Sequence, residues 1–144
     1  FTEEILNEFK PHLDKKNQTV KVECQTGFVK ANRIMLGQVM SNLLENAIKY
    51  CDSGATVVVR WRENESSTIL KIIDNGPGIS EEHLSRLFER FYRVQYGRVR
   101  GGVAGTGLGL SIAKNCMLKH RGRIEVDSLP GRGTEFTCYF PKNG

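Results

Sequence analysis

The strongest constraint on the fold is a strand-like run that leads directly into a glycine-containing turn. Residues 68–74 are rich in β-branched and apolar side chains, and residues 74–79 then read Asp-Asn-Gly-Pro-Gly-Ile. Asp74 is therefore expected at a strand end, beside a turn whose glycines permit close approach to the backbone. A carboxylate there can accept a hydrogen bond from the exocyclic amine of adenine. Taken alone, an Asp-Asn-Gly sequence is also a common turn that binds nothing.

A second glycine motif follows later in the chain, where residues 105–110 read Gly-Thr-Gly-Leu-Gly-Leu. These residues open a predicted helix, and backbone N–H groups at the start of a helix bind phosphate well. The motif is not a Rossmann fingerprint, because a loop rather than a strand precedes it. It is not a P-loop, because the Lys-Ser/Thr pair that ends such loops is missing. By itself the motif indicates a phosphate site only weakly.

The helix predicted over residues 32–50 has two chemically different sides. With one residue every 100° or so, an arc of roughly 100° carries the polar side chains Asn42, Glu45, Asn46 and Lys49. The opposite side is apolar and explains how the helix packs. Taken alone, the polar side could simply be a solvated face, although such a face is more often built from Glu, Lys and Arg, since asparagine is a mediocre helix former. An asparagine amide oxygen can bind Mg²⁺, and Lys49 can place a positive charge beside phosphates.

Length and composition fit one globular domain over residues 1–144, with 39% hydrophobic and 26% charged residues. No apolar run approaches the roughly 20 residues of a membrane-spanning helix, so membrane insertion is not expected. The net charge of +5 comes from dispersed basic residues, and no nucleic-acid partner is expected. The four cysteines form no Cys-x-x-Cys pair, which fits reduced thiols in the cytoplasm. Because the chain opens within a predicted helix, we expect it to be a piece of a longer protein.

Periodicity predicts a mixed α/β order with a sheet covered by helices on one side. Helices are predicted over residues 1–16, 32–50, from 80 onward and over 108–119, and strands over 20–24, 56–62, 68–74, 123–128 and 134–140. Pro11 is expected to kink or interrupt the first helix, and Asn32 to cap the second. Residues 93–107 contain five glycines and three arginines, Arg93, Arg98 and Arg100, and are predicted to form a mobile loop.

Together these motifs resemble the catalytic and ATP-binding domain of sensor histidine kinases, within the superfamily of gyrase, Hsp90, histidine kinase and MutL. Residues 42–50 are similar to the N box of that family, residues 74–79 to its G1 box, residues 88–93 to its F box and residues 105–110 to its G2 box. The boxes occur in the family's order and the resemblance covers essentially the whole chain. It implies the Bergerat-type ATP-binding fold, a two-layer α/β sandwich. That fold has a mixed, mainly antiparallel sheet of about five strands, with about three helices on one face.

The resemblance also implies roles for individual residues. Asn46 would bind Mg²⁺, with Asn42 as a second candidate ligand, and Lys49 would contact the phosphates of ATP. Asp74 would read the adenine amine, and residues 93–106 would form a lid over the nucleotide. The implied catalytic residues are Asn42, Glu45, Asn46, Lys49 and Arg93. The other implied nucleotide-binding residues are Tyr50, Gly76, Gly78, Ile79, Phe91, Tyr92, Arg93, Gly105, Thr106, Gly107, Leu108, Gly109 and Leu110.

One position separates phosphoryl transfer to histidine from ATP hydrolysis. In the ATPases and related serine kinases of the superfamily, a glutamate four residues before the metal-binding asparagine acts as general base. This chain has Asn42 there, and a neutral amide cannot take a proton from water or from a serine hydroxyl. A histidine acceptor needs no such base, because its neutral ring nitrogen already carries a lone pair. Glu45 could still orient a metal-bound water, which leaves slow hydrolysis open.

The expected function is transfer of the γ-phosphate of Mg-ATP to a histidine on a separate helical dimerisation domain, in two-component signal transduction. A response-regulator receiver domain is the second expected partner. The full protein is expected to be a homodimer, either cytoplasmic or the cytoplasmic part of a membrane-anchored sensor. His12, His83 and His120 lie outside any acceptor motif and are predicted to be surface residues, with the charge of His120 suited to a helix end. An ATP-driven switch of the gyrase or Hsp90 type and a non-catalytic nucleotide-binding module remain as alternatives.

Overall fold

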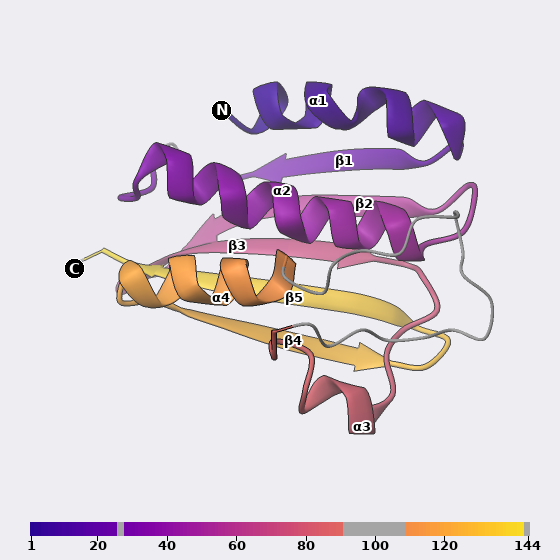
Figure 1. Cartoon of the computed structure of the whole chain (residues 1–144). Coiled ribbons are helices and arrows are strands. Elements are labelled where there is room, and N and C mark those ends of the chain that lie inside the picture. Colours follow the sequence, from indigo (N-terminus) through magenta and orange to yellow (C-terminus); the bar gives the residue numbers. More distant parts are fainter. Residues whose placement is uncertain (26–27, 91–108, 143–144) are drawn as a thin grey trace.

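The computed structural model describes residues 1–25, 28–90 and 109–142 as one sheet with helices beside it (Figure 1). The helices are α1 (Thr2–Lys15), α2 (Arg33–Tyr50), α3 (Glu81–Leu84) and α4 (Gly109–Lys119). The strands are β1 (Thr19–Cys24), β2 (Thr56–Glu63), β3 (Ser67–Asp74), β4 (Arg123–Leu129) and β5 (Gly133–Pro141). The expected loop over residues 93–107 lies outside the described residues.

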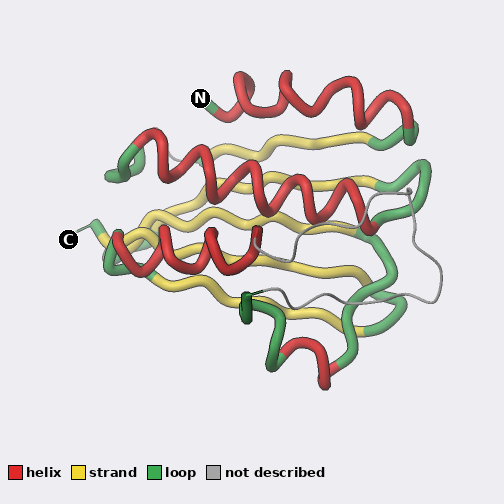
Figure 2. The backbone as a smooth tube through the Cα atoms, in the orientation of Figure 1, coloured by secondary structure: helices red, strands yellow, loops and turns green. Residues whose placement is uncertain are grey.

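The five strands form a single mixed sheet in the order β1-β2-β3-β5-β4. β1 and β2 are parallel, and α2 makes the crossover between them, whereas the other three pairs are antiparallel. Figures 1 and 2 show α1, α2 and α4 together on one face of the sheet, with the short α3 beside the β4 edge. The expected two-layer sandwich with a mainly antiparallel sheet is therefore confirmed.

The core lies between α2, α4 and the covered face of the sheet. Every second residue of β3 is buried, as expected for a strand with one face against helices. The largest fully buried side chains come from the middle strands and from the apolar sides of the two helices, among them Phe136, Phe140, Met40, Leu43, Leu44, Leu70, Ile72 and Met117. The apolar side of α2 thus faces the sheet, and its polar side is left toward solvent and toward the start of α4.

The first helix continues through Pro11, so the expected interruption does not occur. Proline removes a hydrogen bond to the carbonyl of residue 7, but Asn7 and Pro11 both lie on the exposed side of α1, where water can take the place of the lost donor. On the opposite side, Ile5 and Leu13 are buried and anchor the helix on both sides of the proline. Among the described helices, none is long and apolar enough to cross a membrane.

The helix predicted from residue 80 onward is only one turn long, because the chain after Leu84 closes tighter turns. Arg86 N–H bonds to His83 O, and Glu89 N–H bonds to Arg86 O, both with a spacing of three residues. Within this segment Leu87 is buried, and the Phe88 ring packs edge-on against Phe136, with 6.2 Å between ring centroids. Apolar contacts with the sheet therefore hold this segment in the absence of a longer helix.

The N-terminal end of α2 is held by two polar side chains. Asn32 caps the helix as predicted, because its Oδ1 accepts the N–H of Met35 at 3.0 Å. His120 Nε2 accepts the N–H of Asn32 at 2.9 Å, and its Nδ1 lies 2.7 Å from Cys116 O. A ring nitrogen that accepts cannot carry a proton, so the described geometry needs a neutral ring with its proton on Nδ1. The half-buried His120 ring thus has a structural role at the start of α2.

Candidate functional site

The polar side of α2 carries the four residues that were predicted to share one side of this helix: Asn42, Glu45, Asn46 and Lys49. Asn42 and Asn46 are half-buried, and Glu45 is exposed. Lys49 is the more enclosed member of an ion pair with Glu45, with 3.6 Å between Nζ and Oε1 and 18% of the lysine side chain exposed. The amide oxygens and the ammonium group thus follow one stripe along the C-terminal half of the helix.

The start of α4 lies against this stripe. A Cβ atom placed on Gly109, the first residue of α4, would lie 3.1 Å from Asn42 Oδ1, so glycine permits a close approach of the two helices here. Backbone N–H groups at the start of an 11-residue helix carry partial positive charge, and the first turn of α4 contains no acidic side chain. Leu110 is half-buried and packs against the core. The described part of the second glycine motif therefore lies against Asn42 on the polar side of α2.

Asp74 is the last residue of β3, and its side chain is turned into the protein. The residue is only 8% exposed, and its Oδ1 accepts the N–H of Gly76 at 2.9 Å. Burial raises the pKa of Asp74, while hydrogen bonds from Gly76 N–H, the Cys51 thiol and the Thr134 backbone act in the opposite direction. The carboxylate is thus fixed by several donors in a position with little water.

The turn after Asp74 is braced against the connection between β4 and β5. Gly78 has a φ of +77°, and a Cβ atom there would lie 2.0 Å from Leu129 O, which only glycine avoids. Pro77 O accepts the N–H of Gly131 at 2.7 Å. Ile79 N–H donates to Ser128 Oγ at 2.8 Å, so the buried Ile79 is fixed as well. The shape of the turn is therefore fixed by contacts within the protein.

Two further contacts tie this region to neighbouring strands. Asn75 Oδ1 accepts the N–H of Thr56, the first residue of β2, at 2.9 Å. Ser128 Oγ donates to Gly133 O at 2.7 Å and lies 2.9 Å from Thr134 Oγ1. Thr134 itself is opposite Asp74 in the β3–β5 ladder. The edge where β3 ends is thus surrounded by polar groups that belong to three different strands.

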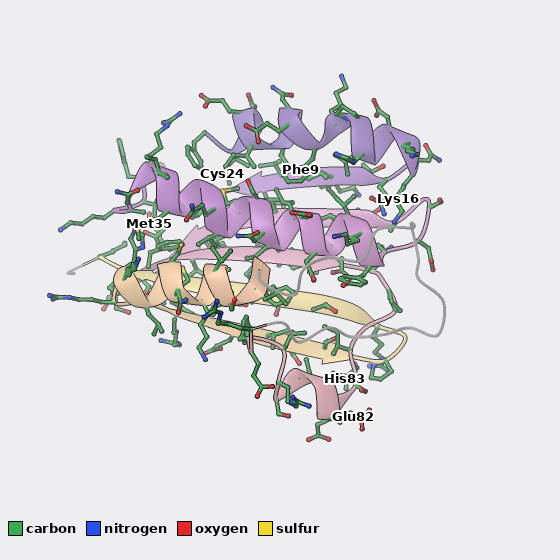
Figure 3. The ribbon with its side chains drawn as sticks, in the orientation of Figure 1. Phe9, Lys16, Cys24, Met35, Glu82 and His83 are labelled. Atoms are coloured by element: carbon green, nitrogen blue, oxygen red, sulfur yellow. The ribbon has the colours of Figure 1, made fainter. Side chains whose placement is uncertain are left out.

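The C-terminal end of α2 is held from outside the site. Lys16 Nζ donates to three carbonyl oxygens of this end, those of Ile48, Lys49 and Cys51, at 2.8, 3.2 and 2.8 Å. Gln18 Nε2 donates to the carbonyl oxygens of Ile48, Cys51 and Asp52, each at 3.2 Å. Figure 3 shows Lys16 where the chain leaves α1, beside the end of α2. These donors satisfy the last carbonyls of the helix, which lack partners within it.

Sequence reasoning missed Cys51, Ser128 and Thr134, which line or brace the Asp74 edge. Ser128 and Thr134 did leave a signal, because each is a polar residue at an inward-facing position of an alternating strand. Cys51 directly follows the polar helix and left no such signal. The remaining candidate site residues, Phe91, Tyr92, Arg93, Gly105, Thr106, Gly107 and Leu108, lie outside the described residues, as does the expected lid.

The amide oxygens on α2 suit a hard cation whose other coordination positions are filled by a bound ligand and by water. Among the described residues, no group of three or more His, Cys, Asp or Glu could hold a metal. Asn42 and Asn46 offer amide oxygens, which Mg²⁺ accepts when phosphates and water fill its other positions. The site thus joins a buried carboxylate at one strand end to amide oxygens, an ammonium group and a helix start nearby. It can hold an anionic ligand that carries an amine-bearing ring.

Comparison with known proteins agrees with this geometry. The sequence profile of the family described as "Histidine kinase-, DNA gyrase B-, and HSP90-like ATPase" matches residues 31–144. The phosphate regulon sensor protein PhoR of Pseudomonas aeruginosa is 42% identical over 112 residues, which are 78% of this chain and 25% of PhoR. The chain spans about a quarter or less of the curated relatives that it matches.

Solved structures give the same result over nearly the whole chain. The mycobacterial sensor histidine kinase MprB superposes with a TM-score of 0.80 at 30% identity, covering 97% of this chain and 94% of that one. The catalytic domain of histidine kinase ThkA, in a nucleotide-free form, has a TM-score of 0.83 at 26% identity, covering 97% and 90%. The resemblance inferred from the four boxes is confirmed: the chain belongs to the histidine kinase-, DNA gyrase B- and HSP90-like ATPase family.

Proposed function

We propose that this chain binds Mg-ATP and transfers its γ-phosphate to a histidine on a separate helical dimerisation domain, as part of two-component signal transduction. The observation that carries the proposal is the composition of the α2 face beside Gly109. It offers two asparagines and a lysine, and its one carboxylate, Glu45, is exposed and paired with Lys49. The names of PhoR, MprB and ThkA, all sensor proteins or histidine kinases, support the same assignment.

Asp74 would recognise the base of ATP. Its carboxylate is buried at the end of β3 and accepts the N–H of Gly76, a contact within the protein that fixes its orientation. The exocyclic amine of adenine can donate to it, whereas guanine presents a carbonyl at the corresponding ring position. Gly76, Gly78 and Ile79 would shape the pocket around the ring, and Tyr50 would flank the nucleotide.

The other end of the nucleotide would lie along α2, at the start of α4. Lys49 and the first N–H groups of α4 would contact the phosphates, and Asn46 with Asn42 would hold Mg²⁺, which supplies positive charge against phosphate oxygens. The lone pair of the acceptor histidine nitrogen attacks the γ-phosphorus, the bond to the β–γ bridging oxygen breaks, and ADP leaves with that electron pair. Positioning and electrostatic stabilisation would supply most of the catalysis.

The remaining assignments concern the longer protein. We propose that residues 1–144 act as one catalytic domain of a homodimeric sensor kinase, cytoplasmic or on the cytoplasmic side of a membrane. Its partners would be the histidine-bearing dimerisation domain and a response-regulator receiver domain. Arg93 and the lid over residues 93–106 would complete the site around the triphosphate.

The test is a calorimetric titration of the chain with ATP, with and without Mg²⁺, while released phosphate is followed in the same samples. We expect Mg-dependent binding with negligible phosphate release, and phosphate transfer after an acceptor domain is added. Asn46→Ala is expected to weaken binding in the presence of Mg²⁺ more than in its absence. Brisk phosphate release would instead support an ATP-driven switch, and absence of binding would support a module that has lost its chemistry.

A further inference from the structure

Cys51, the residue after α2, has a fixed place beside Asp74. Its side chain is buried, with 2% of the residue exposed. Its N–H donates to Ala47 O at 3.1 Å, and its carbonyl oxygen accepts from Lys16 Nζ and Gln18 Nε2. The backbone of Cys51 is therefore held at both of its polar groups, and its thiol has little freedom to move.

The Cys51 thiol and the Asp74 carboxylate border the same small space. A Cβ atom built on Gly76 would lie 2.6 Å from Cys51 Sγ and 3.0 Å from Asp74 Oδ1. The thiol donates a hydrogen bond to the carboxylate. Burial raises the pKa of Cys51 to about 12, and the nearby Asp74 charge acts in the same direction. The group is thus an S–H donor at neutral pH and not a thiolate.

The hydrogen-bond capacity of Asp74 leaves room for a ligand. An ionised carboxylate has about four lone-pair positions. Among the described residues, three donors take positions on it: Gly76 N–H, the Cys51 thiol and the Thr134 backbone N–H. The remaining position can accept one N–H from a bound base. Loss of one protein donor would let the buried carboxylate rotate and would make its ionised form more costly.

We propose that Cys51 is a positioning residue that orients the Asp74 carboxylate toward the amine of a bound adenine. This inference rests on the proposed function, because it requires that Asp74 reads adenine. The thiol does not itself contact the base. It acts through Asp74, so it should affect the recognition of the amine and leave the contacts to ribose and phosphates unchanged.

A comparison of two nucleotides that differ only in the exocyclic amine distinguishes a positioning role of Cys51 from a purely structural one. ATP carries the exocyclic amine, and purine riboside triphosphate lacks it. Both are titrated calorimetrically in the presence of Mg²⁺ into the wild-type chain, Cys51→Ala and Cys51→Ser. Cys138→Ala is the matched control, because Cys138 is also buried and has a pKa raised to about 12 by burial alone.

We expect Cys51→Ala to weaken ATP binding about five- to tenfold, the effect of one ordinary hydrogen bond, and to leave the analogue within about twofold. Cys51→Ser keeps a donor and should bind both nucleotides nearly as the wild type does. Cys138→Ala should not change the ratio of the two affinities. If Cys51→Ala fails to fold, Cys51→Thr and Cys51→Val replace the pair, since they have similar shape and differ in one hydroxyl donor.

Three results would overturn the inference. Cys51→Ala could weaken both nucleotides equally, it could weaken neither, or the serine variant could lose as much ATP affinity as the alanine variant. Each of these would leave the proposed function intact if the wild type binds ATP. A wild-type chain that binds neither nucleotide would overturn the proposed function and this inference together.

Discussion

The two ends of α2 are both held by side chains from distant parts of the sequence, but they use their polar groups differently. At the N-terminal end, Asn32 and His120 bond to each other and to the neighbouring backbone, so these groups serve the structure. At the C-terminal end, Lys16 and Gln18 satisfy the helix carbonyls from outside. Asn42, Glu45, Asn46 and Lys49 on α2 itself are thus not among the groups that satisfy the last carbonyls of the helix.

The two ends of α2 also differ in the residues that surround them. A hollow of about 470 Å³ lies at the N-terminal end, lined by Lys30, Ala31, Asn32, Met35, Lys119, His120, Arg121 and Pro141. Asp74, Gly76 and Gly78 lie at the other end, where the turn is shaped by glycines and by the β4–β5 connection. The Asp74 end is therefore shaped by contacts within the protein: Gly78 lies against Leu129, and Pro77 O accepts the N–H of Gly131.

The largest expected effect follows from adding a methyl group at Gly133. This residue has a φ of +89°, and a Cβ atom would lie 2.0 Å from Asp74 O. We expect Gly133→Ala to lower the free energy of unfolding by roughly 3–5 kcal/mol, from backbone strain and overpacking together. Denaturant unfolding measures this.

The control for that substitution is Gly131→Ala, in the same turn. Gly131 also has a positive φ, +80°, but a Cβ atom there would have nothing within 4 Å. Only the left-handed strain of about 1–2 kcal/mol should remain. Equal losses in the two variants would show that the close contact between residue 133 and the Asp74 backbone does not determine the stability.

The second prediction concerns Asp74→Asn, which should lower ATP affinity and raise the stability of the ligand-free fold. Burial raises the pKa of Asp74 above its ordinary value of 3.8. The folded state therefore holds the proton more strongly than the unfolded chain, and that stabilisation is lost as the pH rises through the folded pKa. At neutral pH the ionised carboxylate is a cost, which asparagine removes. We expect about 100-fold weaker ATP binding, because the amide presents N–H groups to the amine.

Thermal unfolding at several pH values completes that test. The melting temperature of Asp74→Asn should exceed that of the wild type by ~2–5 °C at neutral pH. The gap should shrink as the pH falls below the folded pKa of Asp74, where the wild-type carboxyl is protonated. Asp14→Asn removes a negative charge at an exposed position of α1. It should change neither the ATP affinity nor the melting temperature. Unchanged ATP affinity in Asp74→Asn would refute the adenine assignment.

Many features of the two ends of α2 could be predicted from the sequence, because periodicity and turn chemistry depend on residues close together in the chain. The cap at Asn32, the two sides of α2 and the position of Asp74 at a strand end all follow from residues close in sequence. The contacts that hold the two ends of α2 could not be predicted. His120 reaches Asn32 across 88 residues, and Lys16 reaches Cys51 across 35. Single polar residues in such distant pairs leave no periodic signal.

The third prediction separates the two ends of α2 directly. Lys16→Met keeps the aliphatic stem but removes the ammonium donor to three carbonyl oxygens. His120→Phe keeps a ring against Phe140 but leaves the N–H of Asn32 without its acceptor. Each should cost about 1–2 kcal/mol of unfolding free energy. Only Lys16→Met should also weaken ATP binding, by a few-fold, because Lys49 and Tyr50 belong to the last turn that it holds. Weaker binding in His120→Phe would contradict this separation.

The smallest expected effect belongs to the ion pair between Arg33 and Glu4, at the N-terminal end of α2. Its atoms are 2.9 Å apart, which by distance alone indicates a strong contact. The two side chains are 67% and 70% exposed, however, so water and salt screen the pair almost fully. Arg33 also lies over the Phe1 ring, 4.9 Å from its centroid, and keeps that contact without Glu4. We expect Glu4→Gln to change the free energy of unfolding by less than about 0.5 kcal/mol, at low and at high salt alike. A loss of 1 kcal/mol or more, which disappears at about 1 M salt, would show that this end of α2 depends on surface charge as well as on Asn32 and His120.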